Sequence, residues 1–391
     1  MSKAVVSEPK THALLGASSS HMWLVCTPSA RMCEDMPDVK SSHAAEGSLA
    51  HEICELKLRK AYIEPMSART FTTRLNKLKK EDLYKNEMLA CSDTYVDYID
   101  NIMLSYPTSP YIAVERKVDF SQYVPEGFGT ADCVIIYGDT LHIIDYKHGQ
   151  GVQVSAEHNS QMMLYALGAL SFYAMLYDIK RVKLAIVQPR LNNISEWELT
   201  TDELIAWGND YVKPRAQAAY EGKGECVSGE HCRFCRAKAI CKARANANLA
   251  LAKHAFAEPL TLSNDEIGDI LQQAQDLKKW ADDVKDYALS EVLKGNSIPG
   301  WKAVEGRSVR VFKDTDKAFT VLKENGIDES MLYERVPLTL AKIETMLGKS
   351  TFAELMTEQI VKSPGKPTIV PESDKREPYT VTSAQQVFSN N

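Results

Sequence analysis

Residues 129–147 constrain the fold of this chain more than any other segment. Their sequence is Gly-Thr-Ala-Asp-Cys-Val-Ile-Ile-Tyr-Gly-Asp-Thr-Leu-His-Ile-Ile-Asp-Tyr-Lys, two runs rich in β-branched and aromatic residues on either side of Gly138-Asp139. Such runs predict β-strands, and a two-residue loop that begins with glycine suits a type II′ turn. We therefore expect a β-hairpin.

The register of this hairpin places two carboxylates together. If Tyr137 faces Thr140, counting outward brings Asp132 opposite Asp145, with Cβ atoms about 5 Å apart, and Lys147 follows on the same face because strands have a period of two. Close carboxylates repel unless a proton or cation lies between them, and a divalent ion with oxygen ligands is the ordinary solution. Such an ion can polarise a phosphodiester and activate water while the ammonium stabilises developing charge. The alternative is the polar outer face of an edge hairpin.

The rest of the chain predicts a mixed α/β architecture. Strand patterns occur at 111–120, 131–137, 141–147, 181–188 and 194–199, and helical patterns at 44–62, 81–104, 160–177 and 201–220. The apolar helix at 160–177 follows the hairpin and is expected to pack on the sheet. The predicted fold is α/β (α+β), a central mixed sheet flanked by helices with a mostly helical C-terminal extension.

The C-terminal part carries a second helical signal. Ser263 and Glu266 form a capping-box pattern, and apolar residues then recur at spacings of three and four, so a long amphipathic helix is expected over 264–293. Its stripe can pack on the same chain or on a partner helix, which would give an oligomer. The expected divisions are a first domain at 1–256, a helical extension at 257–362, and an extended tail at 363–391 that is rich in Pro, Ser and Thr.

Composition limits the partners and the compartment. The net charge of −6 disfavours wholesale binding to nucleic acid, so DNA contacts must come from metal ions or from basic patches such as 74–80 and 233–244, each of which can also be a solvated helix face. No apolar run approaches the ~20 residues of a membrane span, and no secretion signal is visible. A cytoplasmic location without membrane contact follows, and nine cysteines in a reducing compartment point to metal ligation or buried thiols.

Several of these residues match a known pattern in order. Gly129-Thr-Ala-Asp132, Asp145-Tyr-Lys147 and Gln161-x-x-x-Tyr165 resemble the signature of RecB-like PD-(D/E)XK nucleases over roughly residues 15–245. The resemblance implies a restriction-endonuclease-like core in which the Asp and Asp-x-Lys residues bind Mg²⁺ or Mn²⁺ and run hydrolysis, while Gln161 and Tyr165 contact the DNA strand. A spacing of four places that last pair on one helix face; their alternative is a buried polar pair bonded to the backbone.

Two further residues are candidates for the same metal site. Gly47 and His51 in Glu-Gly-Ser-Leu-Ala-His look like the helical Gly and His that the family carries upstream of the sheet, which makes His51 a candidate metal ligand and catalytic residue. Without the resemblance, His51 is an ordinary surface histidine. Glu115, in the strand before the hairpin, is a candidate extra carboxylate ligand.

The spacing Cys232-x2-Cys235-x5-Cys241 is a strong metal signal, because three thiolates in a short basic loop suit a tetrahedral or cubane site that needs a fourth ligand. Cys226 would complete a local zinc site. Cys26 resembles the early cysteine of the nuclease subgroup containing AddB and the CRISPR adaptation nucleases, and that resemblance implies a 4Fe-4S cluster that staples the chain ends. The remaining cysteines, Cys33, Cys54, Cys91 and Cys133, are interpreted as buried thiols.

The whole chain is also similar to a domain-of-unknown-function family common in phages and prophages. This similarity extends to the Gly-Trp-Lys stretch that begins at residue 300 and to the tail from residue 364. It implies a role in phage DNA replication or recombination. Together with the nuclease signature, it leads us to expect a metal-dependent DNA exonuclease, with DNA and a recombination or single-strand-binding protein as partners. Two alternatives stay open: a non-catalytic DNA-binding module that keeps the fold and the metal cluster, and a redox protein.

Overall fold

A five-stranded mixed sheet lies at the centre of the first part of the chain, in the order β1 to β5. Its strands are β1 (Tyr111–Asp119), β2 (Phe128–Tyr137), β3 (Thr140–Tyr146), β4 (Arg181–Gln188) and β5 (Asn193–Thr200). β3 and β4 pair in parallel, and every other neighbouring pair is antiparallel. All five strands fall where the sequence predicts them, and the mixed α/β class is confirmed.

The computed structural model describes residues 13–37, 42–250, 264–304, 315–324 and 348. The chain divides into two compact units, 1–303 and 304–391, and in the second only α11 (Thr315–Glu324) is described as an element. The boundaries expected near residues 256 and 362, and the expected tail, lie outside the described residues. None of the helices in the described ranges combines the length and the apolarity that crossing a membrane requires.

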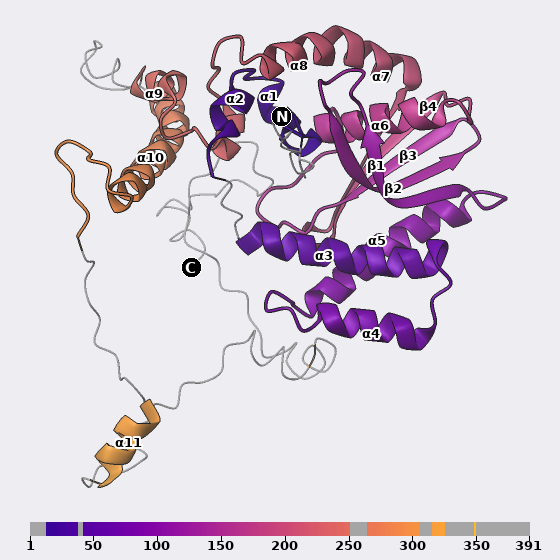
Figure 1. Cartoon of the computed structure of the whole chain (residues 1–391), viewed down its shortest axis with the longest axis horizontal. Coiled ribbons are helices and arrows are strands. Elements are labelled where there is room, and N and C mark those ends of the chain that lie inside the picture. Colours follow the sequence, from indigo (N-terminus) through magenta and orange to yellow (C-terminus); the bar gives the residue numbers. More distant parts are fainter. Residues whose placement is uncertain (1–12, 38–41, 251–263, 305–314, 325–347, 349–391) are drawn as a thin grey trace, which may run out of the picture. The chain divides into compact units, whose positions relative to one another are not determined.

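Helices cover both faces of the sheet (Figure 1). On one side lie α3 (Ser42–Leu58), its π-helical continuation η2 (Arg59–Ile63), α4 (Ala68–Leu78) and α5 (Glu87–Leu104). On the other side lie α6 (Ser160–Tyr173), α7 (Thr201–Trp207), the π-helical turn η4 (Gly208–Val212) and α8 (Lys213–Tyr220). Short N-terminal elements, η1 (Ala17–Ser19), α1 (Ser20–Trp23) and α2 (Ser29–Glu34), and two short 3-10 turns, η3 (Pro189–Leu191) and η5 (Glu230–Phe234), complete this part together with α9 (Lys242–Leu249) and α10 (Asn264–Leu293).

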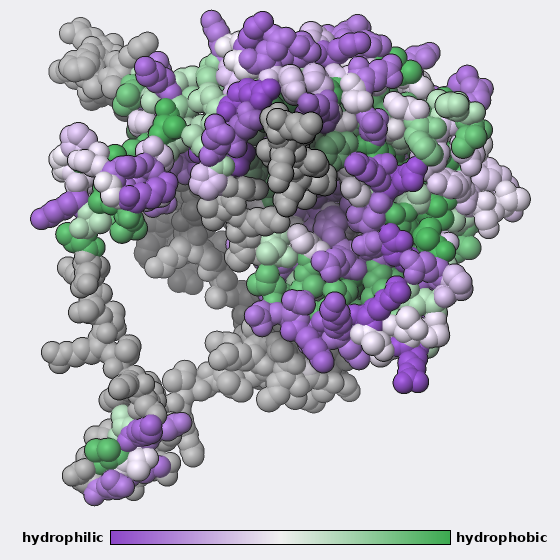
Figure 2. Space-filling model, viewed as in Figure 1, coloured by the Kyte–Doolittle hydropathy of each residue, from purple (hydrophilic) through white to green (hydrophobic). Residues whose placement is uncertain are grey.

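The sheet separates two apolar cores. One core joins the sheet to α6 and α7, and the other joins it to α3 and α5. α6 connects the parallel strands β3 and β4, the ordinary place for a crossover helix, and it is apolar on nearly every side because the sheet, α1 and α7 surround it. Hydrophilic residues cover the outer surface of α7 and α8 (Figure 2), as expected for helices with one buried stripe.

The long helix predicted at 264–293 is present as α10 and contacts α9 of the same chain. Asp283 of α10 pairs with Lys238 and with Arg244, each at 2.7 Å. Two cations of the basic patch at 233–244 are therefore neutralised within the chain, which favours the interpretation that α10 packs on its own chain. The other patch, 74–80, includes the end of α4, a helix that the sequence patterns did not predict.

Candidate active site

The hairpin β2–β3 has the predicted register. Tyr137 pairs with Thr140, and the ladder continues to Cys133 and Ile144. The turn has a positive φ of 58° at Gly138, which the type II′ geometry requires of its first residue. One step beyond the last pair the strands separate, and Oδ2 of Asp132 accepts a hydrogen bond of 2.8 Å from the backbone N–H of Tyr146.

Beside the point where β2 and β3 separate, the alternation of side chains in β1 and β2 is interrupted, so residues that would point to one side of the sheet point to the other. Glu115 of β1 has φ of +50° and lies opposite Asp132 in a register that is otherwise continuous. Val114 packs in the core under α3 and α5, whereas Val118, four residues later, packs in the core under α6. β2 changes face in the same way around Asp132. A left-handed glutamate costs of order 1–3 kcal/mol, so this bend stores strain where two carboxylates meet.

His51 completes a group of three potential metal ligands. It comes from α3, and its Nδ1 lies 3.3 Å from Oδ2 of Asp132. One ligand atom each from His51, Glu115 and Asp132 lies within 4.8 Å of the others. A pocket opens beside the group and is lined by His51, Cys54, Glu55, Leu58, Tyr95, Val114, Glu115, Asp132 and Tyr146.

The charges of this group are strongly coupled. Burial alone would lower the pKa of His51, but the charges of Asp132 and Asp145 raise it to about 9. Burial and the nearby Asp132 raise the pKa of Glu115 to about 7. Burial also favours the neutral form of Asp132, but the charge of His51 and the Tyr146 N–H outweigh it and leave that pKa below its ordinary value. The proton on His51 thus supplies the positive charge that a bound cation would otherwise place beside Asp132.

A second set of polar side chains surrounds Asp145. Its buried Oδ2 forms an ion pair with Nζ of Lys147 at 3.0 Å. Lys147 donates to Oε1 of Gln161 at 3.0 Å, and Nε2 of Gln161 donates to Oδ1 of Asp145 and to the hydroxyl of Tyr165, both at 3.2 Å. Burial raises the pKa of the Asp145 carboxyl, and the Lys147 charge only partly opposes this effect. The structure thus brings together four of the five residues predicted from the hairpin and from α6, while the fifth, Asp132, belongs to the group around His51.

The two sets lie side by side, but Asp132 and Asp145 do not form the directly opposed pair that the register predicts. Asp132 turns toward His51 and Tyr146, while Asp145 is held by Lys147 and Gln161. Asp145 is therefore not a member of the three-ligand group. Asp132 and Asp145 are not paired across the hairpin, because the strands separate one step beyond Cys133 and Ile144.

Of the two glycines in the matched motifs, Gly129 alone has a structural explanation. A Cβ atom on Gly129 would lie 2.7 Å from Cε1 of Tyr165, so this glycine lets the tyrosine ring lie against β2. A Cβ atom on Gly47 would meet nothing within 4 Å. Nothing in the structure explains a glycine there.

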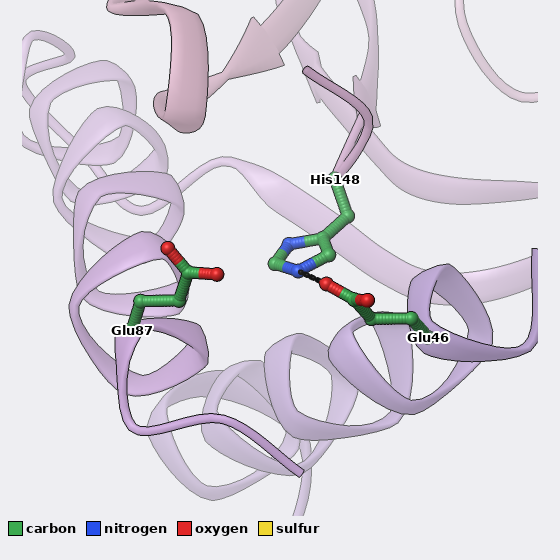
Figure 3. Close-up of side chains that lie close together, drawn as sticks. All are labelled: Glu46, Glu87 and His148. Atoms are coloured by element: carbon green, nitrogen blue, oxygen red, sulfur yellow. Dashed lines mark ion pairs between the residues drawn. The ribbon is translucent and has the colours of Figure 1, made fainter. Parts of the chain in front are cut away.

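A second cluster near the site was not predicted from the sequence. Glu46, Glu87 and His148 point toward one another from α3, α5 and the segment just after β3 (Figure 3). Arg190 bridges the two glutamates at 3.1 and 3.0 Å, and Lys85 pairs with Glu46 at 2.7 Å. The carboxylate charges are thus already balanced by two cations, which makes this cluster a poor site for a metal ion. His148 also contacts the hydroxyl of Tyr146 through Nδ1 at 2.9 Å, so the cluster anchors the end of β3.

The N-terminal segment and the cysteine-rich loop lie side by side. Backbone carbonyls and side chains about 190 to 200 residues apart are joined by hydrogen bonds from Thr27 to Lys223, from Arg31 to Tyr220, from Arg215 to Leu24 and from Arg236 to Met36. Cys26 therefore comes to the region that also holds the later cysteines, and α1 contacts η5.

Both candidate fourth ligands reach this region. Burial and the nearby thiols of Cys26 and Cys241 raise the pKa of Cys226 to about 11. Cys232 and Cys235 are buried. Cys33 is buried, as the sequence predicts, and also lies here, with its Sγ 3.7 Å from Sγ of Cys235. The spacing of the later cysteines does not predict this contact, because Cys33 lies in α2, 202 positions before Cys235.

One family model matches residues 12–377, and its description is "Protein of unknown function (DUF2800)". A solved structure titled "Crystal structure of SSO0001" is similar to the chain at 14% sequence identity. The match covers 57% of this chain and 96% of that chain with a TM-score of 0.23, a similarity too low to carry an argument about the fold.

Proposed function

The chain belongs to the family described as Protein of unknown function (DUF2800), and we propose that it is a metal-dependent DNA exonuclease with a RecB-like PD-(D/E)XK core. One observation carries the proposal: the three-ligand group of His51, Glu115 and Asp132 lies beside the Asp145–Lys147 pair at one end of a hairpin. A histidine, three carboxylates and a lysine in that arrangement suit phosphodiester hydrolysis.

The donor set fits a hard divalent ion, Mg²⁺ or Mn²⁺. Carboxylate oxygens are the preferred ligands of these ions, and His51 can contribute a nitrogen once it loses its proton. Oδ2 of Asp145 is buried and paired with the Lys147 ammonium, and it would become a further ligand where the ion takes the place of that ammonium. When bound, the ion would polarise the phosphodiester and lower the pKa of an attacking water.

The remaining polar residues would orient the reaction. Lys147 keeps its charge, because Asp145 and Asp132 outweigh burial and raise its pKa. Its ammonium would therefore stabilise negative charge that develops on the phosphate. Gln161 and Tyr165 lie on α6 beside this ammonium, where they would position the DNA strand.

We further propose that Cys26, Cys232, Cys235 and Cys241 hold a 4Fe-4S cluster, with zinc and Cys226 as the alternative. Thiolates are the usual ligands of both. Because Cys26 and the other three ligands are separated by some two hundred residues, a shared metal centre would join the two segments already connected by hydrogen bonds. It would thus hold the nuclease core closed and contribute to folding.

Within this proposal the protein acts in the cytoplasm on phage or prophage DNA during replication or recombination, together with a recombination or single-strand-binding protein. The test is an assay of end-labelled single- and double-stranded DNA with Mg²⁺, with Mn²⁺ and with excess chelator. Release of short products only with a divalent ion supports the nuclease. DNA that binds but stays intact under all conditions would favour the non-catalytic DNA-binding module.

A further inference from the structure

Cys33 and Cys235 lie side by side, although Cys235 belongs to the proposed metal centre and Cys33 does not. The two residues are 202 positions apart, yet their sulfur atoms are 3.7 Å apart. Cys33 is 2% exposed and Cys235 is 9% exposed. They pack together with Ala237 in a small apolar cluster.

The fold holds this pair together from both sides. Cys33 lies in α2, and Cys235 directly follows η5. Arg236, the residue after Cys235, donates a hydrogen bond of 2.8 Å to the carbonyl of Met36 just beyond α2. Met22 and Met36 pack against the pair. The proximity of the two thiols is thus a property of the packed segments and does not depend on one side-chain rotamer alone.

We propose that Cys33 and Cys235 form a reversible disulfide when the protein lacks its cysteine-bound metal and meets a peroxide. Cys33 would react first: its sulfur takes one oxygen from hydrogen peroxide, forming a sulfenic acid and releasing water. The Cys235 sulfur then displaces the hydroxyl, which leaves with the thiol proton as a second water. Two thiols and one peroxide thus yield one disulfide and two waters.

The disulfide would control metal loading, and this consequence rests on the proposed cysteine metal centre. Cys235 is one of its four ligands, so the oxidised protein would lack a complete set. Bound metal would in turn prevent the disulfide, because the Cys235 thiolate is then already coordinated. A thiol reductant restores both sulfurs and the capacity to load metal.

The sequence makes the test unambiguous. Trypsin cleaves after Arg31, Lys40, Arg233 and Arg236, so Cys33 and Cys235 fall in separate peptides, 32–40 and 234–236, that contain no other cysteine. Full-length protein is stripped of metal by a chelator under reduction, treated with one equivalent of hydrogen peroxide, alkylated and digested. Mass spectrometry should find 32–40 joined to 234–236 as the main cross-link, and dithiothreitol should remove it.

Two variants separate the disulfide from its consequence. Cys33→Ser should lose the cross-link and still take up iron or zinc after peroxide treatment, whereas Cys91→Ser, which removes a buried thiol in α5, should behave like the wild type. Alkylated 32–40 and 234–236 peptides, or Cys235 joined mainly to Cys232 or Cys241, would overturn the proposal. If the cross-link forms in a protein that binds no metal by any preparation, the disulfide stands and the metal centre fails.

Discussion

Glu115 lies opposite Asp132 with its backbone in the left-handed region, and both strands change face at this pair. The position has two effects that oppose each other. The strained backbone lowers the stability of the fold, while the bend turns the Glu115 carboxylate toward Asp132 and His51. The backbone of Glu115 therefore lowers the stability of the fold, while its carboxylate belongs to the candidate metal site.

Replacing Glu115 should separate these two effects. Glu115→Gly relieves the left-handed strain and removes a half-buried charge, so we expect the metal-free protein to gain about 1 kcal/mol in unfolding free energy at pH 8. It should also need a higher Mn²⁺ concentration for half-maximal cleavage. Glu115→Gln removes the same charge but keeps the backbone strain, so it should show the second effect with a smaller gain in unfolding free energy than Glu115→Gly. Urea unfolding and metal titrations measure both; a destabilised glycine variant with unchanged metal demand contradicts the account.

Metal binding should strengthen as pH rises. His51 has a pKa of about 9 and Glu115 of about 7 without metal, and both must lose a proton to act as ligands. The increase in melting temperature caused by saturating Mn²⁺ should therefore be larger at pH 9 than at pH 6. In His51→Gln this difference should shrink.

The metal-free protein should show the opposite trend at the same residue. The pKa of folded His51 is raised above its ordinary value of 6.5, so its pairing with Asp132 stabilises the fold fully below pH 6.5 and is lost as pH rises through about 9. Melting temperatures of wild type and His51→Gln in chelator should converge over that range. Curves that stay parallel would show that His51 does not hold the proton assigned to it.

Gln161 and Tyr165 should differ in their effects on cleavage. Gln161 contacts Lys147, Asp145 and Tyr165, whereas the Tyr165 hydroxyl has only Gln161 as a hydrogen-bond partner among the contacts described. Gln161→Ala should lower the single-turnover rate by about 10²-fold, as expected for a misplaced reacting group, and Tyr165→Phe by less. Both should retain more activity than loss of Asp145. Wild-type rates and DNA affinity in both variants would assign the pair to the core of α6.

The cysteine centre is tested by two matched substitutions. Anaerobically prepared protein should be brown and contain about four irons per chain. Cys26→Ser should lower metal content, melting temperature and nuclease activity together, while Cys226→Ser should leave them nearly unchanged. Colourless protein with one zinc, sensitive at Cys226 and indifferent at Cys26, would favour the local zinc site.

The hairpin was predictable because its register depends only on local counting from Gly138, and the same holds for Gln161 and Tyr165, whose helical spacing fixes a common face. Glu115 was predictable as a candidate but not as a left-handed residue, since no local preference of glutamate favours that conformation. The turn of Asp132 toward His51 accompanies the packing of α3 on the sheet, which sequence spacing does not record. Cys33 and the Glu46–His148 contact were missed for the same reason.

The most direct test of the central claim compares two aspartates of one hairpin. Asp145 is buried beside Lys147, whereas Asp139 lies in the turn and is about half exposed, paired with Arg181. Single-turnover cleavage of end-labelled DNA in Mg²⁺ should fall to background in Asp145→Asn and stay near the wild-type rate in Asp139→Asn, with both variants folded by circular dichroism. Wild-type cleavage by folded Asp145→Asn would contradict the proposed active site.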